Sequence, residues 1–188
     1  MRRLRTFIAL ELGANVIGKA AKLIRQLQET DVEANWVNPE NMHLTLKFLG
    51  EVTEAEAVDI CKVVGNAAKK IEPFEIIFRG AGAFPTLENP KTVWIGVQDG
   101  AANLIELQNV IDEALHRELR YSREQRRFMP HLTLGRIKRG DLQQVTNILT
   151  QNSQFDADLC VVDEVVTFSS FPTPLGPKYE PLAHAPLA

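Results

Sequence analysis

The tetrapeptide His-Leu-Thr-Leu occurs twice in this chain, at residues 43–46 and again at residues 131–134. Imidazole titrates near neutral pH, so two histidines can hold one neutral and one protonated ring at the same time. The neutral ring takes a proton from an attacking water or hydroxyl, and the protonated ring gives one to the leaving oxygen. Threonine hydroxyls could donate hydrogen bonds to the nonbridging oxygens of a phosphate. The doubled motif therefore predicts metal-free acid–base chemistry on a phosphodiester. The residues concerned are His43, Thr45, His131 and Thr133.

Two other interpretations of these histidines are weaker. A single strand histidine is usually a hydrogen-bonded structural residue, but two identical His-x-Thr units are poorly explained by packing alone. A zinc site needs three or four N, S or O ligands, and the threonines are poor ligands while Cys61 and Cys160 are wrongly spaced. The remaining histidines, His116 in a helix and His184 in the tail, are expected to face solvent. We therefore expect no metal and no cofactor.

Each motif lies in a run of alternating apolar and polar residues, which is typical of a β-strand. The leucines of each copy then point into the core, and the histidine and threonine point together to the other face. Strict alternation also turns Phe48 inward and places Arg136 on the leucine side, unless the second strand ends or bulges there. The two motifs would thus each present a histidine and a hydroxyl from a sheet surface.

The elements that must position the motifs follow from periodicity and from turn and capping residues. Strands are expected at residues 6–10, 35–37, 43–50, 74–78, 92–97, from 131 onward, and 159–168. Helices are expected at residues 14–28, 53–70, 101–119 and 141–149, with a loop over 80–90 and an irregular proline-containing tail from 171. The resulting fold class is α/β (α+β), in one bilobal domain over residues 1–188. Its two pseudo-symmetric α/β halves each carry an antiparallel-type sheet around one motif, and the motifs face each other across a central cleft.

Composition limits the function classes. The 188 residues carry a net charge of −3, which argues against a protein that coats nucleic acid nonspecifically. No run approaches the roughly 18 apolar residues that span a bilayer, so no membrane partner is expected. Two cysteines without a pairing framework fit a reducing cytoplasm.

The charge around the second motif is positive, although the net charge of the whole chain is negative. Eight basic residues crowd around the second motif: Arg117, Arg120, Arg123, Arg126, Arg127, Arg136, Lys138 and Arg139. A solvated helix end explains the first of them, because cations favour a helix C-terminus. It explains Arg126, Arg127 and Arg136 less well, since they flank the motif itself. These three are candidate phosphate-binding residues.

Aromatic side chains could stack on a base. The candidates are Phe7, Trp36, Phe48, Phe84, Phe128 and Tyr179. We expect most of them in the core, with Phe84 and Phe128 nearest to a site.

The motifs resemble the signature of the two-histidine (2H) phosphoesterase superfamily, His-x-Thr-x in two copies. Within it, three segments look like the bacterial and archaeal RNA 2′,3′-cyclic phosphodiesterases, also called 2′-5′ RNA ligases. These segments are residues 5–10, 43–50 and 128–136. The resemblance implies a bilobal fold and metal-free hydrolysis of a terminal 2′,3′-cyclic phosphate on RNA to a 2′-phosphate. It makes His43 the general acid that protonates the departing 3′ oxygen, and His131 the general base that activates water. Thr45 and Thr133 would hold the phosphate.

Alternatives remain beside cyclic phosphodiester hydrolysis. The same two histidines would serve the reverse reaction, in which a cyclic-phosphate end joins a 5′-hydroxyl end through a 2′-5′ linkage. Small cyclic nucleotides are a further substrate class. A non-catalytic RNA-end binding module is the alternative outside enzymes, although binding alone would not need two titrating groups. In each case we expect a monomer.

Overall fold

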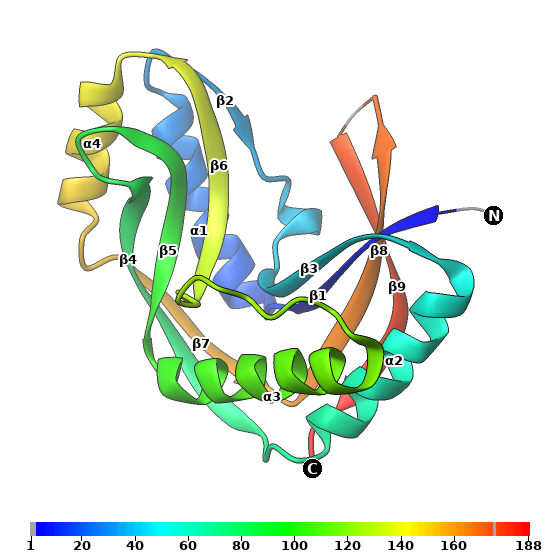
Figure 1. The fold of residues 1–188 in the computed structure, drawn as a ribbon. Helices are drawn as coiled ribbons and strands as arrows, with labels where there is room; N and C mark the ends of the chain where they lie inside the picture. The colour runs from blue at the N-terminus through cyan, green and yellow to red at the C-terminus, as the bar shows by residue number, and fades with distance from the viewer. Residues whose placement is uncertain (1–2, 175) are drawn as a thin grey trace.

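The computed structural model describes residues 3–174 and 176–188, which form four α-helices and two antiparallel sheets (Figure 1). The four-stranded sheet has the order β3-β1-β8-β9, with β1 at Arg3–Leu10, β3 at Leu44–Thr53, β8 at Glu164–Thr173 and β9 at Gly176–Pro186. The five-stranded sheet has the order β2-β6-β5-β4-β7, with β2 at Val32–Trp36, β4 at Phe74–Pro85, β5 at Pro90–Asp99, β6 at His131–Gly140 and β7 at Asp156–Val162. The helices are α1 at Ala14–Gln28, α2 at Glu54–Ala68, α3 at Ala101–Leu119 and α4 at Leu142–Gln151. A short 3₁₀ turn, η1, spans Pro39–Asn41.

The four predicted helices are confirmed, and two of them, α2 and α4, begin at a side-chain cap. Thr53 and Glu56 form a capping box: the Glu56 N–H donates to the threonine hydroxyl, and a Glu56 carboxylate oxygen accepts from the Thr53 N–H. Asp141 caps α4 by accepting from the N–H of Gln143. Short-range signals were therefore sufficient to place the helices.

The two antiparallel sheets, each with one motif strand, confirm the predicted fold class, and the structure adds that strands are exchanged between the two halves of the sequence. Strand β2, from the first half, pairs with β6 of the second motif. Strands β8 and β9, from the second half, complete the sheet of β1 and β3. Each sheet is thus built from both halves of the sequence.

Two predictions about the C-terminal third were also wrong. Residues 159–168 are not one strand: the chain breaks at Asp163, so β7 ends in the five-stranded sheet and β8 begins in the other. The tail is not irregular, because β9 pairs with β8 along its length. Its prolines are compatible with pairing since β9 is an edge strand, where a missing N–H faces outward.

The predicted loop over 80–90 is shorter than expected. Strand β4 continues to Pro85, so the connection to β5 is four residues long. A register shift between Phe78 and Ala81 marks a bulge, and Gly80 takes the positive φ of 84° there. From the sequence alone, a glycine at a strand bulge cannot be told from a glycine in a loop.

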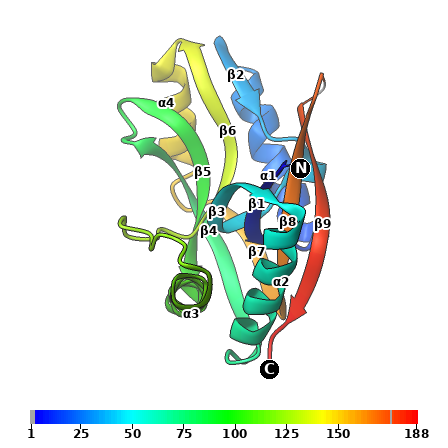
Figure 2. The same ribbon diagram turned by 45° about the vertical axis from the view of Figure 1, so that its right-hand side comes forward.

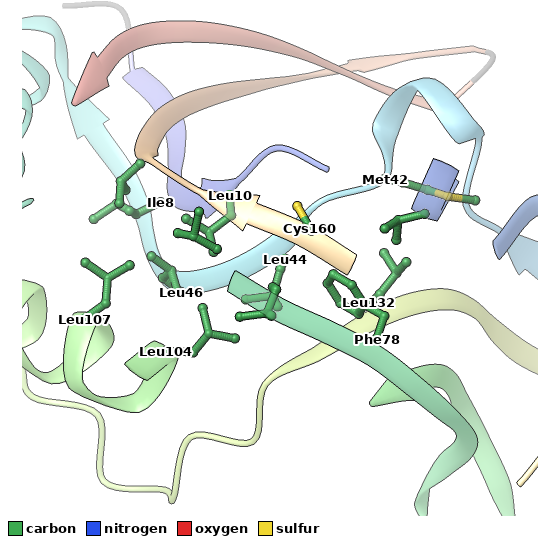
Figure 3. Packing of buried hydrophobic residues seen from close by; sticks show 14 of the residues in the cluster. Ile8, Leu10, Met42, Leu44, Leu46, Phe78, Leu104, Leu107, Leu132 and Cys160 are labelled. Carbon is green, nitrogen blue, oxygen red and sulfur yellow. The ribbon is translucent and has the colours of Figure 1, made fainter. Parts of the chain in front are cut away.

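The leucines of the two motifs belong to the main hydrophobic cluster, as predicted. Figure 3 shows Leu44, Leu46 and Leu132 in this cluster, and all three are buried. Helices α1 and α4 pack on the five-stranded sheet, and α2 packs on the four-stranded sheet (Figures 1 and 2). Helix α3 contacts α2, β3 and β5. The motif histidines and threonines therefore lie away from this core.

Candidate active site

The two histidines make the same backbone contact. His43 Nδ1 donates to the carbonyl of Asn41 at 2.7 Å, and His131 Nδ1 donates to the carbonyl of Met129 at 2.7 Å. A carbonyl only accepts, so each neutral ring carries its proton on Nδ1 and offers Nε2 as a proton acceptor. Each neutral ring can therefore accept a proton at Nε2, and the backbone contact of the histidine is the same in the two motifs.

Both imidazoles are half-buried, and this changes their acidity. Desolvation lowers the pKa of His43 below its usual 6.5, against the opposing effect of its bond to Asn41. Desolvation also lowers the pKa of His131, and the nearby positive charge of Arg136 adds to that shift, while the Met129 carbonyl opposes it. Burial disfavours the charged form of a base. Without a bound anion, both rings are thus neutral at neutral pH.

Aromatic rings hold both imidazoles in place. The Phe7 ring lies 4.9 Å from that of His43, and Tyr179 meets the same imidazole edge-on at 5.2 Å. Phe84 meets His131 edge-on at 5.1 Å. Phe7 belongs to a small buried cluster on the four-stranded sheet, with Tyr179 packed against it. Each histidine is therefore fixed by a carbonyl and by at least one ring.

A bulge follows the threonine in each motif strand. In β6, Thr133 pairs with Trp94 and Gly135 with Val93, so Leu134 is the extra residue. In β3, Leu46 is the extra residue between neighbouring pairs. A bulge reverses the alternation beyond it. Strict alternation was therefore wrong for Phe48, which is 67% exposed rather than inward.

The same bulge turns Arg136 to the histidine side. Its guanidinium donates to the Thr92 hydroxyl at 3.1 Å and lies within electrostatic reach of both His131 and Tyr179. Since Tyr179 contacts His43, the charge of Arg136 acts on a residue of each half-site. Strands β3 and β6 also contact each other. The two motifs therefore contribute to one site.

Thr45 and Thr133 stand on the same faces as their histidines and are half-buried. Within residues 3–174 and 176–188, neither hydroxyl has a hydrogen-bond partner in the protein. Both hydroxyls are consequently free to donate to a bound anion.

The arginines of the basic loop before β6 do not all lie at the candidate site. Arg127 lines a groove of about 600 Å³ that begins at His131. Arg126 is exposed and does not line that groove, although its backbone N–H donates to the Glu124 carboxylate at 3.0 Å. Of the three predicted arginines, the structure brings Arg127 and Arg136 to the site, and it leaves Arg126 on the rim.

A buried ion pair anchors this loop, and the sequence did not reveal it. Lys47 contacts Asp112 of α3 at 2.5 Å, with side chains 8% and 5% exposed. The Asp112 carboxylate also accepts from the N–H of Glu124 at 3.2 Å and from Arg123 Nε at 3.4 Å. Lys47 donates further to the carbonyl of Ser122 at 2.9 Å. Because partners 65 residues apart carry no local pattern, only the fold identifies them.

Metal-ligand side chains gather once within the described residues, where ligand atoms of Glu11, Glu164 and His184 lie within 4.8 Å of one another. A 3.0 Å contact between His184 Nδ1 and Glu164 accounts for part of that grouping. As predicted, His116 and His184 are both exposed. None of these residues belongs to a motif.

Among the described residues, no helix has the length and apolar character that crossing a membrane requires.

The family model described as LigT like Phosphoesterase matches this chain twice, over residues 10–94 and 95–179. The chain is 31% identical over 179 residues to an RNA 2′,3′-cyclic phosphodiesterase of Aquifex aeolicus, covering 95% of each chain. It is 34% identical to one of Archaeoglobus fulgidus, covering 95% of this chain and 98% of the other.

Solved structures agree on the fold. A protein of Thermus thermophilus superimposes with a TM-score of 0.80 at 24% identity, over 97% of each chain. E. coli LigT complexed with ATP gives a TM-score of 0.76 at 25% identity, covering 100% of this chain and 99% of the other. Each of the two family matches contains one His-Leu-Thr-Leu motif. The two motifs therefore belong to two repeats of the same family sequence.

Proposed function

This chain belongs to the LigT-like phosphoesterase family, and we propose on that basis that it hydrolyses the 2′,3′-cyclic phosphate at the 3′ end of RNA to a 2′-phosphate. The relatives that match along nearly its whole length are named RNA 2′,3′-cyclic phosphodiesterases. The observation that carries the proposal is the pair of equivalent histidines, each with Nε2 free to exchange a proton. A binding module would have no use for two such groups.

In the proposed reaction, His131 Nε2 takes a proton from water as the water oxygen attacks phosphorus. The bond from phosphorus to the 3′ oxygen breaks, and protonated His43 gives its Nε2 proton to that oxygen. Thr45 and Thr133 donate hydrogen bonds to the nonbridging oxygens, and Arg136 offsets their charge. His43 must gain a proton that burial disfavours, and the approaching phosphate anion supplies the opposite charge that favours it.

End-group analysis tests this function. A short RNA with a 2′,3′-cyclic phosphate is incubated with the protein and excess EDTA, and the product end is identified. Conversion to a 2′-phosphate is expected. A 3′-phosphate would keep the two histidines but reverse the assigned polarity. An unchanged end on RNA that remains bound would favour the binding module.

The pH dependence of kcat/KM should be shifted to acid. This constant reports ionisations of the free enzyme, in which His131 must be neutral and His43 protonated. Burial lowers both pKa values below the usual 6.5, so kcat/KM is expected to peak below pH 6.5 and to fall as His43 loses its proton. The optimum of kcat should lie higher, because the bound anion favours protonated His43. Arg136→Gln should move the acidic limb upward, and a kcat/KM that keeps rising above pH 6.5 contradicts these roles.

The basic loop is proposed to steer RNA through Arg126 and Arg127. Changing both to alanine is expected to reduce the slope of log K against log salt by about 0.7 for each phosphate that these arginines neutralise. RNA binding is measured across a salt series. Lys69→Ala with Lys70→Ala, an exposed pair beyond the end of α2, is the control. An unchanged slope would return the arginines to the role of solvated loop residues.

We further propose that residues 1–188 act as one catalytic domain and as a monomer, because both motif histidines come from the same chain. Small cyclic nucleotides are included in the proposed substrate class. A cytoplasmic location is supported by the two cysteines, which are both free thiols.

A further inference from the structure

The groove beside His131 extends well beyond the motif. Its lining comes from β4, β5, the start of α3 and the loop before β6, elements that lie side by side in Figure 1. The described lining includes Arg79 and Arg127 but no carboxylate. Arg79 is partly offset by Asp156 at 3.4 Å, whereas Arg127 has no ion-pair partner among the described residues. The groove therefore attracts an anion, although the whole chain is acidic.

Trp94 provides the largest aromatic surface of this groove. It stands on the same face of the five-stranded sheet as Thr133, its partner across β5 and β6. A Cβ at Gly82 would lie 2.3 Å from the indole Cη2, and a Cβ at Gly96 would lie 3.3 Å from Cζ3. The indole thus rests on two glycines, and a larger residue at Gly82 would displace it. Glycine within a strand often marks such a close approach.

The indole N–H contributes no hydrogen bond to the protein. Among the described residues, Trp94 Nε1 is the buried side-chain donor that lacks a partner. An unpaired buried donor costs stability, and phenylalanine would avoid that cost. What Trp94 offers at this position is the extended face of its ring.

Phe84 joins this ring to the catalytic centre. It lies 5.2 Å from Trp94 and 5.1 Å from His131. A planar ligand on Trp94 is therefore separated from His131 by a single aromatic side chain. Aromatic faces stack on any base, while arginine contacts phosphate.

We propose that this groove binds a nucleobase of the RNA substrate, stacked on Trp94, with Arg127 contacting a phosphate. The inference rests on the proposed function and adds a subsite to it. Three features select a nucleotide rather than an apolar ligand: the aromatic floor, the positive charge without carboxylates, and continuity with His131. Stacking tolerates every base, so the subsite favours RNA ends in general over a particular sequence.

Tryptophan fluorescence tests binding directly, because the chain has two tryptophans. Trp36 is a matched control: it also rests on a glycine, since a Cβ at Gly135 would lie 2.5 Å from the indole Cε3, but it does not line the groove. Adenosine 2′-monophosphate is expected to quench the fluorescence of Trp36→Phe, which retains Trp94, and not that of Trp94→Phe. Ribose 5-phosphate, which has no base, should leave both unchanged. Equal quenching of both variants, or none in Trp36→Phe, overturns the subsite.

Kinetics provide a second readout. The ratio of kcat/KM for adenosine 2′,3′-cyclic phosphate to that for the base-free methyl riboside 2′,3′-cyclic phosphate is measured. Trp94→Leu is expected to lower this ratio by about tenfold, and Trp36→Leu to keep it at the wild-type value. A purely structural role would lower both constants and preserve the ratio, which contradicts the proposal. If the wild type opens neither substrate, the proposed function fails, and quenching in Trp36→Phe still decides the subsite.

Discussion

His131→Ala and His43→Ala are each expected to lower kcat by about 10² to 10⁴, the usual contribution of a positioned acid or base. Each substitution removes a ring whose Nε2 is proposed to exchange the proton, while the threonines and arginines that we propose to hold the phosphate remain. RNA affinity should therefore change by only a few-fold. Single-turnover rates and equilibrium binding of the same RNA separate the two effects.

His116→Ala is the matched control for that experiment. His116 also bonds a backbone carbonyl through Nδ1, that of Tyr121 at 2.8 Å, but it is exposed and outside both motifs. Its loss should leave kcat at the wild-type value. Full turnover by either motif variant, or an equal loss of RNA binding in both, would remove the acid–base assignment.

Asp112→Ala is expected to destabilise the protein by about 3–5 kcal/mol, since it leaves the Lys47 ammonium buried without its partner. The three hydrogen bonds that this carboxylate accepts from Lys47, Glu124 and Arg123 are removed together. Urea unfolding measures the change. Lys62→Met is the control, because its contact with Asp59 is exposed and worth about 0–1 kcal/mol.

Unfolding at acid pH separates the stability that comes from the charge of Asp112 from the stability that comes from its packing. Burial raises the pKa of Asp112. The hydrogen bond and the positive charge of Lys47, the N–H of Glu124 and the hydrogen bond from Arg123 lower it by more, so the pKa lies below the usual 3.8. The ion pair's contribution is therefore present above pH 3.8 and is lost as pH falls through the lower folded value. Asp112→Asn should lack that loss. The double variant Lys47→Met, Asp112→Leu should cost less than Asp112→Ala, and an equal or larger cost would contradict the burial argument.

The sequence predicted what depends on short-range order. The helices, the motif strands and the inward leucines follow from periods of 3.6 and 2 and from caps such as Thr53. Alternation failed for Phe48 because a bulge reverses a strand's faces, and a bulge depends on the partner strand. The prolines of β9 suggested an irregular tail. Proline is tolerated in an edge strand, but the position of a strand in its sheet cannot be predicted from the local sequence.

The sequence named the histidines and threonines of the candidate site, but it did not predict their surroundings. Phe7 could be named as an aromatic, yet its contact with His43 arises from pairing between β1 and β3. Trp94 was missed altogether, although Gly82 and Gly96 in neighbouring strands signal a backbone approached closely by a bulky group. Asp112 carried no signal, because its partners are distant in sequence.

The exchange of strands between the sheets has a consequence for synthesis. A chain leaves the ribosome from its N-terminus, and β1 and β3 emerge long before β8 and β9, which complete their sheet. Tyr179, whose ring meets His43 edge-on, lies in β9, which emerges after the other described strands. Pairings so distant in sequence form late in folding. A nascent chain that ends before β9 would thus carry both histidines without a finished site, and activity would begin only after β9 has emerged and paired.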